Sequence, residues 1–230
     1  MGPRAIWRWH GWRSTATGTG RRRALFEQGG RAGAWSCLTL ALPLFFVSLS
    51  WSAERSDRAP RTAIALDPLL ASSHSYLAFL LFSAGEYKEA EAAARQALEL
   101  NPQKTYDHFT LGEILLARGH AQDSLAEMKQ EPAPFWRLTG EALAYHKLGR
   151  SQDSNAALTQ LIKDHQQYMA YQIAEIYADR RDADKAFQWL NRAYLQHDAG
   201  MRNLKIDPWL RGIRDDRRYA ELLKKMNLPS

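Results

Sequence analysis

Apolar and polar residues recur with helical periodicity from about residue 69 to the C-terminus, in pairs of short amphipathic stretches separated by turns. Gly85, Gly119 and Gly149 mark three of these turns at intervals of 34 and 30 residues, and Arg181 continues the series after another 32. Five residues after each turn comes a small residue, where two helices of a hairpin must approach closely. These small residues are Ala90, Ser124, Ser154 and Ala186. The even phase predicts four helical hairpins.

The first hairpin carries the most complete pattern. Counted from Ala71, it has apolar or small residues at repeat positions 7, 8, 11, 20 and 27, glycine at 15 and proline at 32. Gly85 can adopt the left-handed conformation that ends a helix. Pro102 ends the second helix because it forces Asn101 out of the helical region.

This unit resembles the tetratricopeptide repeat, and weaker copies that begin at Thr105, Phe135 and Gln167 extend the resemblance over roughly residues 69–197. The resemblance implies an all-α fold, a right-handed superhelical solenoid of helix-turn-helix repeats with a C-terminal capping helix. A unit of two short helices cannot bury its own apolar face and must stack on its neighbours. In the fourth unit we expect helices from Tyr168 to Asp179 and from Ala183 to Leu195.

After Gly200 the pattern changes. Asp207 and Pro208 predict the start of a short helical turn, and Asp216 predicts the N-cap of a final helix that closes the solenoid. The run from Leu204 to Pro229 also resembles the C-terminal ends of repeat arrays in bacterial signalling proteins. Those relatives carry TolB-like, cyclase, kinase or winged-helix domains upstream, and the sequence contains none of them.

The sequence divides into five predicted segments. Residues 1–34 form a basic, disordered arm, residues 35–53 an apolar segment, residues 54–68 a linker with the remnant of a truncated repeat, residues 69–200 four hairpins, and residues 201–230 a cap. The arm holds seven arginines and one acid, which equals the formal net charge of +6 of the whole chain. The rest is neutral, so charge gives no reason to expect that the helical body binds nucleic acid.

The apolar segment predicts a membrane anchor. Trp35 and Trp51 bracket a run without charge, and sixteen helical steps span about 24 Å, somewhat less than a hydrocarbon core of about 30 Å. With the arginines on one side, we expect a single-pass membrane protein whose repeats are extracytoplasmic. A cleaved signal peptide is the alternative. Another is that the first 60 residues are a replacement or mistaken start, in which case the repeats are cytoplasmic.

The resemblance implies a partner-binding groove lined by the first helix of each hairpin, through repeat positions 2, 5, 9, 12 and 13. Carried over residue by residue, these groove residues are Phe79, Phe82, Tyr106, Phe109, Glu113, Trp136, His146, Lys147, Tyr168, Tyr171, Glu175 and Asp179. Such aromatic density suits the anchors of a protein interface. The expected ligand is a peptide or helix with apolar side chains, and with a basic residue opposite Glu175 and Asp179.

The clamp with which related arrays hold chaperone C-terminal tails requires Lys, Asn and Arg at set positions. Those positions hold Ser75, Phe79, Thr110, Trp136 and Gly140, so we do not expect a chaperone-tail binder.

Catalytic chemistry has no matching motif. No histidine pair has the spacing of metalloprotease ligands, no glycine-rich phosphate loop precedes a basic helix, and no nucleophile elbow occurs. His74 and His108 share position 4 of consecutive repeats, which predicts packing inside the hairpins. The lone cysteine, Cys37, cannot form an intrachain disulfide. We therefore expect no enzyme, no cofactor and no metal site.

The sequence thus predicts a bacterial scaffold or adaptor that binds protein in its groove. The alternative is a regulatory or sensory remnant of a signalling protein whose effector domain is absent. A third hypothesis, a nucleic-acid-binding arm, predicts salt-sensitive retention of RNA or DNA by residues 1–34. The oligomeric state is left open.

Overall fold

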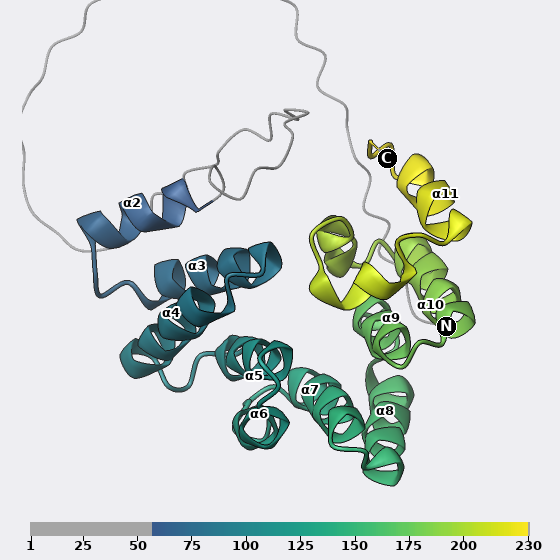
Figure 1. Ribbon diagram of the computed structural model, residues 1–230, viewed down its shortest axis with the longest axis horizontal. Helices are drawn as coiled ribbons and strands as arrows, with labels where there is room; N and C mark the ends of the chain where they lie inside the picture. Colours follow the sequence, from purple (N-terminus) through teal and green to yellow (C-terminus); the bar gives the residue numbers. More distant parts are fainter. Residues whose placement is uncertain (1–56, 230) are drawn as a thin grey trace, which may run out of the picture. The chain divides into compact units, whose positions relative to one another are not determined.

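A computed structural model of the chain describes residues 57–229. In these residues all the regular secondary structure is helical, without a strand (Figure 1). The helices are α2 (Arg58–Leu66), α3 (Ala71–Ala84), α4 (Tyr87–Leu100), α5 (Asp107–Ala117), α6 (Ala121–Met128), α7 (Pro134–Lys147), α8 (Ser151–His165), α9 (Ala170–Asp179), α10 (Ala183–Gln196) and α11 (Arg217–Lys225). Two short 3-10 helices, η1 (Ala199–Asn203) and η2 (Pro208–Ile213), lie between α10 and α11. Helices α3 to α10 pair as successive hairpins, and each hairpin packs on the next. The predicted all-α solenoid with a capping helix is confirmed.

The turns within the hairpins have the left-handed backbone that the spacing predicts. Gly85, Gly119 and Gly149 have φ angles of 88°, 84° and 71°. At the first turn the amide of Glu86 donates to the carbonyl of Leu81, so the last carbonyls of α3 are satisfied before α4 begins.

The small residues pack where the helices of each hairpin cross. All four are almost fully buried, and the two serines also bond to the partner helix. Ser124 Oγ donates to the carbonyl of Gly112 at 2.7 Å, and Ser154 Oγ donates to that of Ala142 at 2.6 Å. The second and third hairpins therefore use the same hydrogen bond over the same twelve-residue separation.

A second repeated contact involves the two position-4 histidines. His74 Nε2 lies 2.9 Å from the carbonyl oxygen of Pro68, and His108 Nε2 lies 3.2 Å from that of Pro102. Both rings are at least half buried, as predicted. In the first two hairpins the repeated unit thus includes the proline turn before the first helix, at Pro68 and at Pro102.

The fourth turn has Arg181 in the left-handed region, with a φ of 61°. A residue with a Cβ is destabilised by about 1–2 kcal/mol in this conformation, and glycine avoids that strain. Glycine also has more conformational freedom in the unfolded chain, which offsets part of the stabilisation. We expect Arg181→Gly to raise the free energy of unfolding by about 0.5–1 kcal/mol, measured by urea denaturation. Arg181→Ala, which keeps the strained backbone, should give no gain; equal stabilisation by both variants would contradict this account.

The predicted single-pass membrane topology requires correction. Within residues 57–229 no helix is both long and apolar enough to cross a membrane. The longest of them, α8, has 15 residues and spans about 22 Å, and its surface is largely polar. The apolar segment 35–53, on which the prediction of an anchor depended, lies outside the described residues, as does the arm 1–34.

The N-cap of the final helix is as predicted. The carboxylate of Asp216 accepts from the amide of Arg218 at 2.9 Å, and Tyr219, Leu222 and Leu223 bury their side chains against the rest of the cap. The last repeat helices also agree with the sequence, except that α9 begins two residues after Tyr168. There the amide of Met169 still bonds to the carbonyl of His165 in the preceding turn.

Candidate functional site

The first helices of the hairpins, α3, α5, α7 and α9, present an inner face to the 3-10 segment η2, which lies on the inner side of the arc of hairpins in Figure 1. Trp209 of η2 meets this face. Its indole Nε1 donates to Glu113 of α5 at 2.5 Å, and its ring lies 6.4 Å from that of Phe82 of α3. The ammonium of Lys147 on α7 lies 5.8 Å from the indole centroid. Three residues predicted to line the groove therefore surround one side chain of the chain itself.

Asp207 enters the same face two residues earlier. Its carboxylate accepts from Tyr171 Oη of α9 at 2.8 Å and from the amide of Trp209 at 2.8 Å. The Glu175 carboxyl also faces the Asp207 carboxylate, and the Arg214 guanidinium donates to the backbone carbonyl of Asp207 at 2.8 Å. Asp207 thus begins η2 and joins it to the last hairpin.

Three buried carboxyls gather here, from Glu113, Glu175 and Asp207. Burial raises the pKa of each, and the mutual repulsion of the carboxylates raises the pKa values of Glu113 and Glu175 further. Asp207 accepts from Tyr171, Trp209 and Glu175, which opposes the rise in its pKa. The charge of Asp207 and its hydrogen bond with Glu175 therefore favour the protonated form of Glu175.

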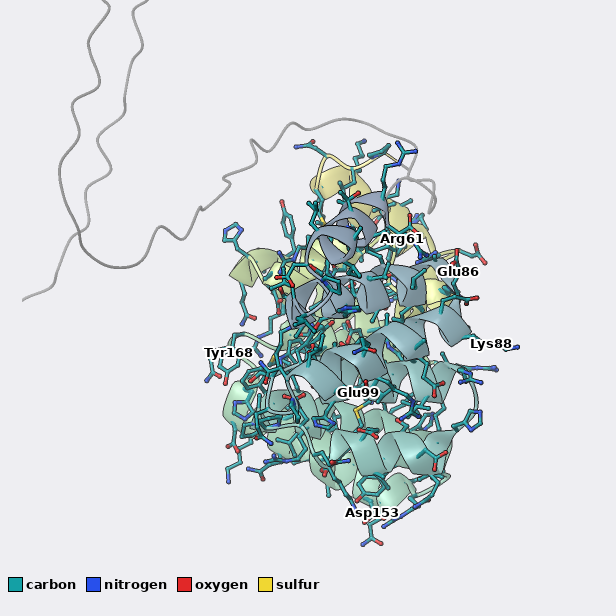
Figure 2. The ribbon with its side chains drawn as sticks, turned by 90° about the vertical axis from the view of Figure 1, so that its left-hand side faces the viewer. Arg61, Glu86, Lys88, Glu99, Asp153 and Tyr168 are labelled. Carbon is teal, nitrogen blue, oxygen red and sulfur yellow. The ribbon has the colours of Figure 1, made fainter. Side chains whose placement is uncertain are left out.

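A second part of the predicted groove forms a connected row of rings, which we term the aromatic rim. Tyr106, Phe109, Trp136, Phe135 and Tyr168 contact one another in turn, with centroid separations from 4.7 to 5.7 Å. Phe109 is buried beneath the others, whereas Tyr106, Phe135 and Trp136 are half-buried and Tyr168 is 51% exposed. Figure 2 shows Tyr168 at the opposite edge of the molecule from Glu86 and Lys88.

The remaining predicted residues lie apart from these two groups or are already paired. Asp179 forms an ion pair with Lys147, so this carboxylate already has a partner within the chain. Glu175 is buried under Asp207, which leaves no free acid at this point for a basic ligand residue. Phe79 and His146 are half-buried, and burial lowers the pKa of His146.

Sequence reasoning missed Asp207 and Trp209 as part of this face. Trp209 lies 96 residues from Glu113 along the chain, and no periodic pattern connects the two positions. The available signal was the tryptophan itself, because a large ring directly after a proline turn needs an apolar partner. Within residues 57–229 no group of three or more His, Cys, Asp or Glu side chains is arranged to hold a metal ion.

Comparison with known proteins gives the following similarities. A crystal structure of MamA has 14% sequence identity over 63% of this chain and 88% of its own, with a TM-score of 0.46. YrrB, described as a TPR protein with an unusual peptide-binding site, has 16% identity over 74% of this chain and 91% of its own, with a TM-score of 0.44. The structure from a functional characterisation of Pseudomonas aeruginosa pilF has 17% identity over 76% of this chain and 84% of its own, with a TM-score of 0.47.

No curated protein matches the sequence. The resemblance to arrays of TolB-like, cyclase or winged-helix proteins is not shown by these comparisons. Residues 71–104, the first hairpin, match the tetratricopeptide repeat family.

Proposed function

We propose that this protein is a non-catalytic scaffold or adaptor that binds a peptide or helix of a protein partner, with the aromatic rim as the main contact. The observation that carries the proposal is the row of rings that reach the surface from three consecutive hairpins, Tyr106, Trp136 and Tyr168, the last two connected through Phe135. These residues occupy position 2 of their repeats, where the tetratricopeptide resemblance expects ligand contacts.

The rim has the chemistry of an interface anchor. Tyr and Trp offer large rigid rings with one polar atom, and each ring that a partner buries can contribute on the order of 2 kcal/mol. Phe109 supports Tyr106 and Trp136 from below at 5.6 and 4.9 Å, so the exposed rings have fixed positions before a ligand arrives. Less ordering is then required on binding.

Binding should depend on the rim. We expect the double variant Trp136→Ala/Tyr168→Ala to weaken partner binding by about tenfold or more, because it removes the two anchors on either side of Phe135. The measurement is quantitative mass spectrometry of proteins that co-purify with the full chain, compared with the unchanged protein. Phe109 is left in place because it belongs to the core.

The matched control is Trp189→Ala/Leu195→Ala on α10, which removes one half-buried and one exposed side chain from a second helix. This control should retain the partners, and both double variants should keep the helical circular dichroism of the parent. If the rim variant recovers the same partners at the same strength, the proposed surface is wrong.

The alternative predicted from sequence, a regulatory part of a signalling system, would use the same surface. Its partner would differ: a kinase, cyclase or DNA-binding protein among the rim-dependent partners would favour that function over a structural scaffold.

A further inference from the structure

We propose that Phe82, Glu113 and Lys147 form a site for an aromatic side chain of a partner protein, and that Trp209 is its internal occupant. This inference rests on the proposed function, that the protein binds a segment of a protein partner. It specifies the kind of partner side chain that is recognised, and it states that Trp209 must leave the site before that side chain can bind.

The site is built for an indole ring. Glu113 is buried and accepts the indole N–H at 2.5 Å, Phe82 packs at 6.4 Å with the rings tilted by 48°, and Lys147 supplies a cation 5.8 Å from the ring centroid. A hydrogen-bond acceptor, an apolar wall and a cation are the three features that recognise a tryptophan. They come from three different hairpins.

The cap is held together by residues other than the indole ring of Trp209. Leu210 and Ile213 are buried in the core of the cap together with Met201 and Leu204, whereas the ring of Trp209 is half-buried and packs against the cores of the hairpins. The backbone amides at the two ends of this segment bond locally, from Asp207 to Asn203 and from Arg214 to Arg211. The tryptophan side chain can therefore leave while the cap remains folded.

Space for an incoming chain lies directly beside the ring. A cleft of about 310 Å³ is bounded by Phe82 and Lys147 on the hairpins and by Trp209 and Arg211 on η2. Arg211 also donates to Tyr87 Oη at 3.3 Å across it. A partner segment in this cleft would contact Trp209 before replacing it.

While Trp209 occupies the site, an external ligand can bind only during the fraction of time in which the site is empty. Its apparent affinity is reduced by that fraction. Removing the tryptophan should therefore create affinity for a free indole. The probe is N-acetyl-tryptophanamide, titrated into the full chain by isothermal calorimetry and ligand-observed NMR. We expect Trp209→Ala to bind it at least about tenfold more tightly than the unchanged protein, and N-acetyl-phenylalaninamide, which lacks the N–H, to bind more weakly.

Two controls define the site. Trp189→Ala removes a half-buried tryptophan from α10 and should gain no affinity. Adding Glu113→Leu to Trp209→Ala should reduce the gain several-fold, because leucine has a similar volume but offers no acceptor to the indole N–H. If Trp209→Ala does not fold, Trp209→Phe replaces it, with an expected gain of a few-fold.

Folded Trp209→Ala that binds the probe no better than Trp189→Ala would overturn the proposal, because Trp209 would then be only a structural contact. A dimer of the unchanged protein that dissociates in Trp209→Ala would overturn it in another way, since the site would then belong to a second copy of the chain. Neither result bears on the rim variants, which test the proposed function separately.

Discussion

Replacing Glu131 with alanine should lower the free energy of unfolding by about 3–5 kcal/mol, measured by urea denaturation. Its fully buried carboxylate accepts from the amides of Tyr106 at 3.0 Å, Phe109 at 3.3 Å and Ala133 at 3.1 Å. Each buried donor left without a partner costs about 1–3 kcal/mol. Tyr106 also has a φ of 84°, so the start of α5 loses the bonds that hold a strained residue.

Two substitutions bracket this result. Glu131→Gln keeps one acceptor oxygen and should lose about half as much stability. Glu99→Ala, on the exposed face of α4, should change stability by no more than about 0.5 kcal/mol. A loss below about 1 kcal/mol for Glu131→Ala would mean that the amides at the start of α5 find other acceptors.

The stability of the protein should fall as pH rises above about 4, through the buried carboxyls of the inner face. Burial raises the folded-state pKa values of Glu113 and Glu175, whereas an unfolded carboxyl titrates near 4. Above that pH the unfolded chain has released these protons and the folded chain still holds them. Each retained proton lowers stability by about 1.4 kcal/mol per pH unit, until the folded-state pKa is passed.

Glu175→Gln isolates this effect, because the amide can still donate to Asp207 and does not titrate. The difference in stability between variant and parent should grow with pH from 4 upward in favour of the variant. The comparison also cancels His146, whose lowered pKa acts in the opposite sense by favouring folding as pH rises toward about 6.5. A pH-independent difference would mean that Glu175 is ionised in the folded protein.

Much of the fold follows from local sequence. Glycine and small residues at fixed intervals define the hairpins, and even Arg181 adopts the turn conformation that its place in the series requires. Backbone sterics and helix packing act within a single repeat, so the sequence of one repeat is enough to predict its turn and its two helices.

The candidate site could be predicted only in part. Tyr106, Trp136 and Tyr168 form a connected row with Phe135 and Phe109, consistent with their repeat positions, although Phe109 is core. The contacts of Trp209 with Glu113 depend on where the cap folds relative to distant hairpins. Glu131 similarly resembles an ordinary loop acid, because its partners lie 22 and 25 residues earlier.

The link from η2 to the first hairpin alters how this array can come apart. In an open repeat array each unit contacts only its neighbours, so the ends fray first and independently. Here Trp209 and Arg211 connect the cap to Phe82 and Tyr87. Separation of the first hairpin and unfolding of η2 therefore break the same contacts, which couples the two events.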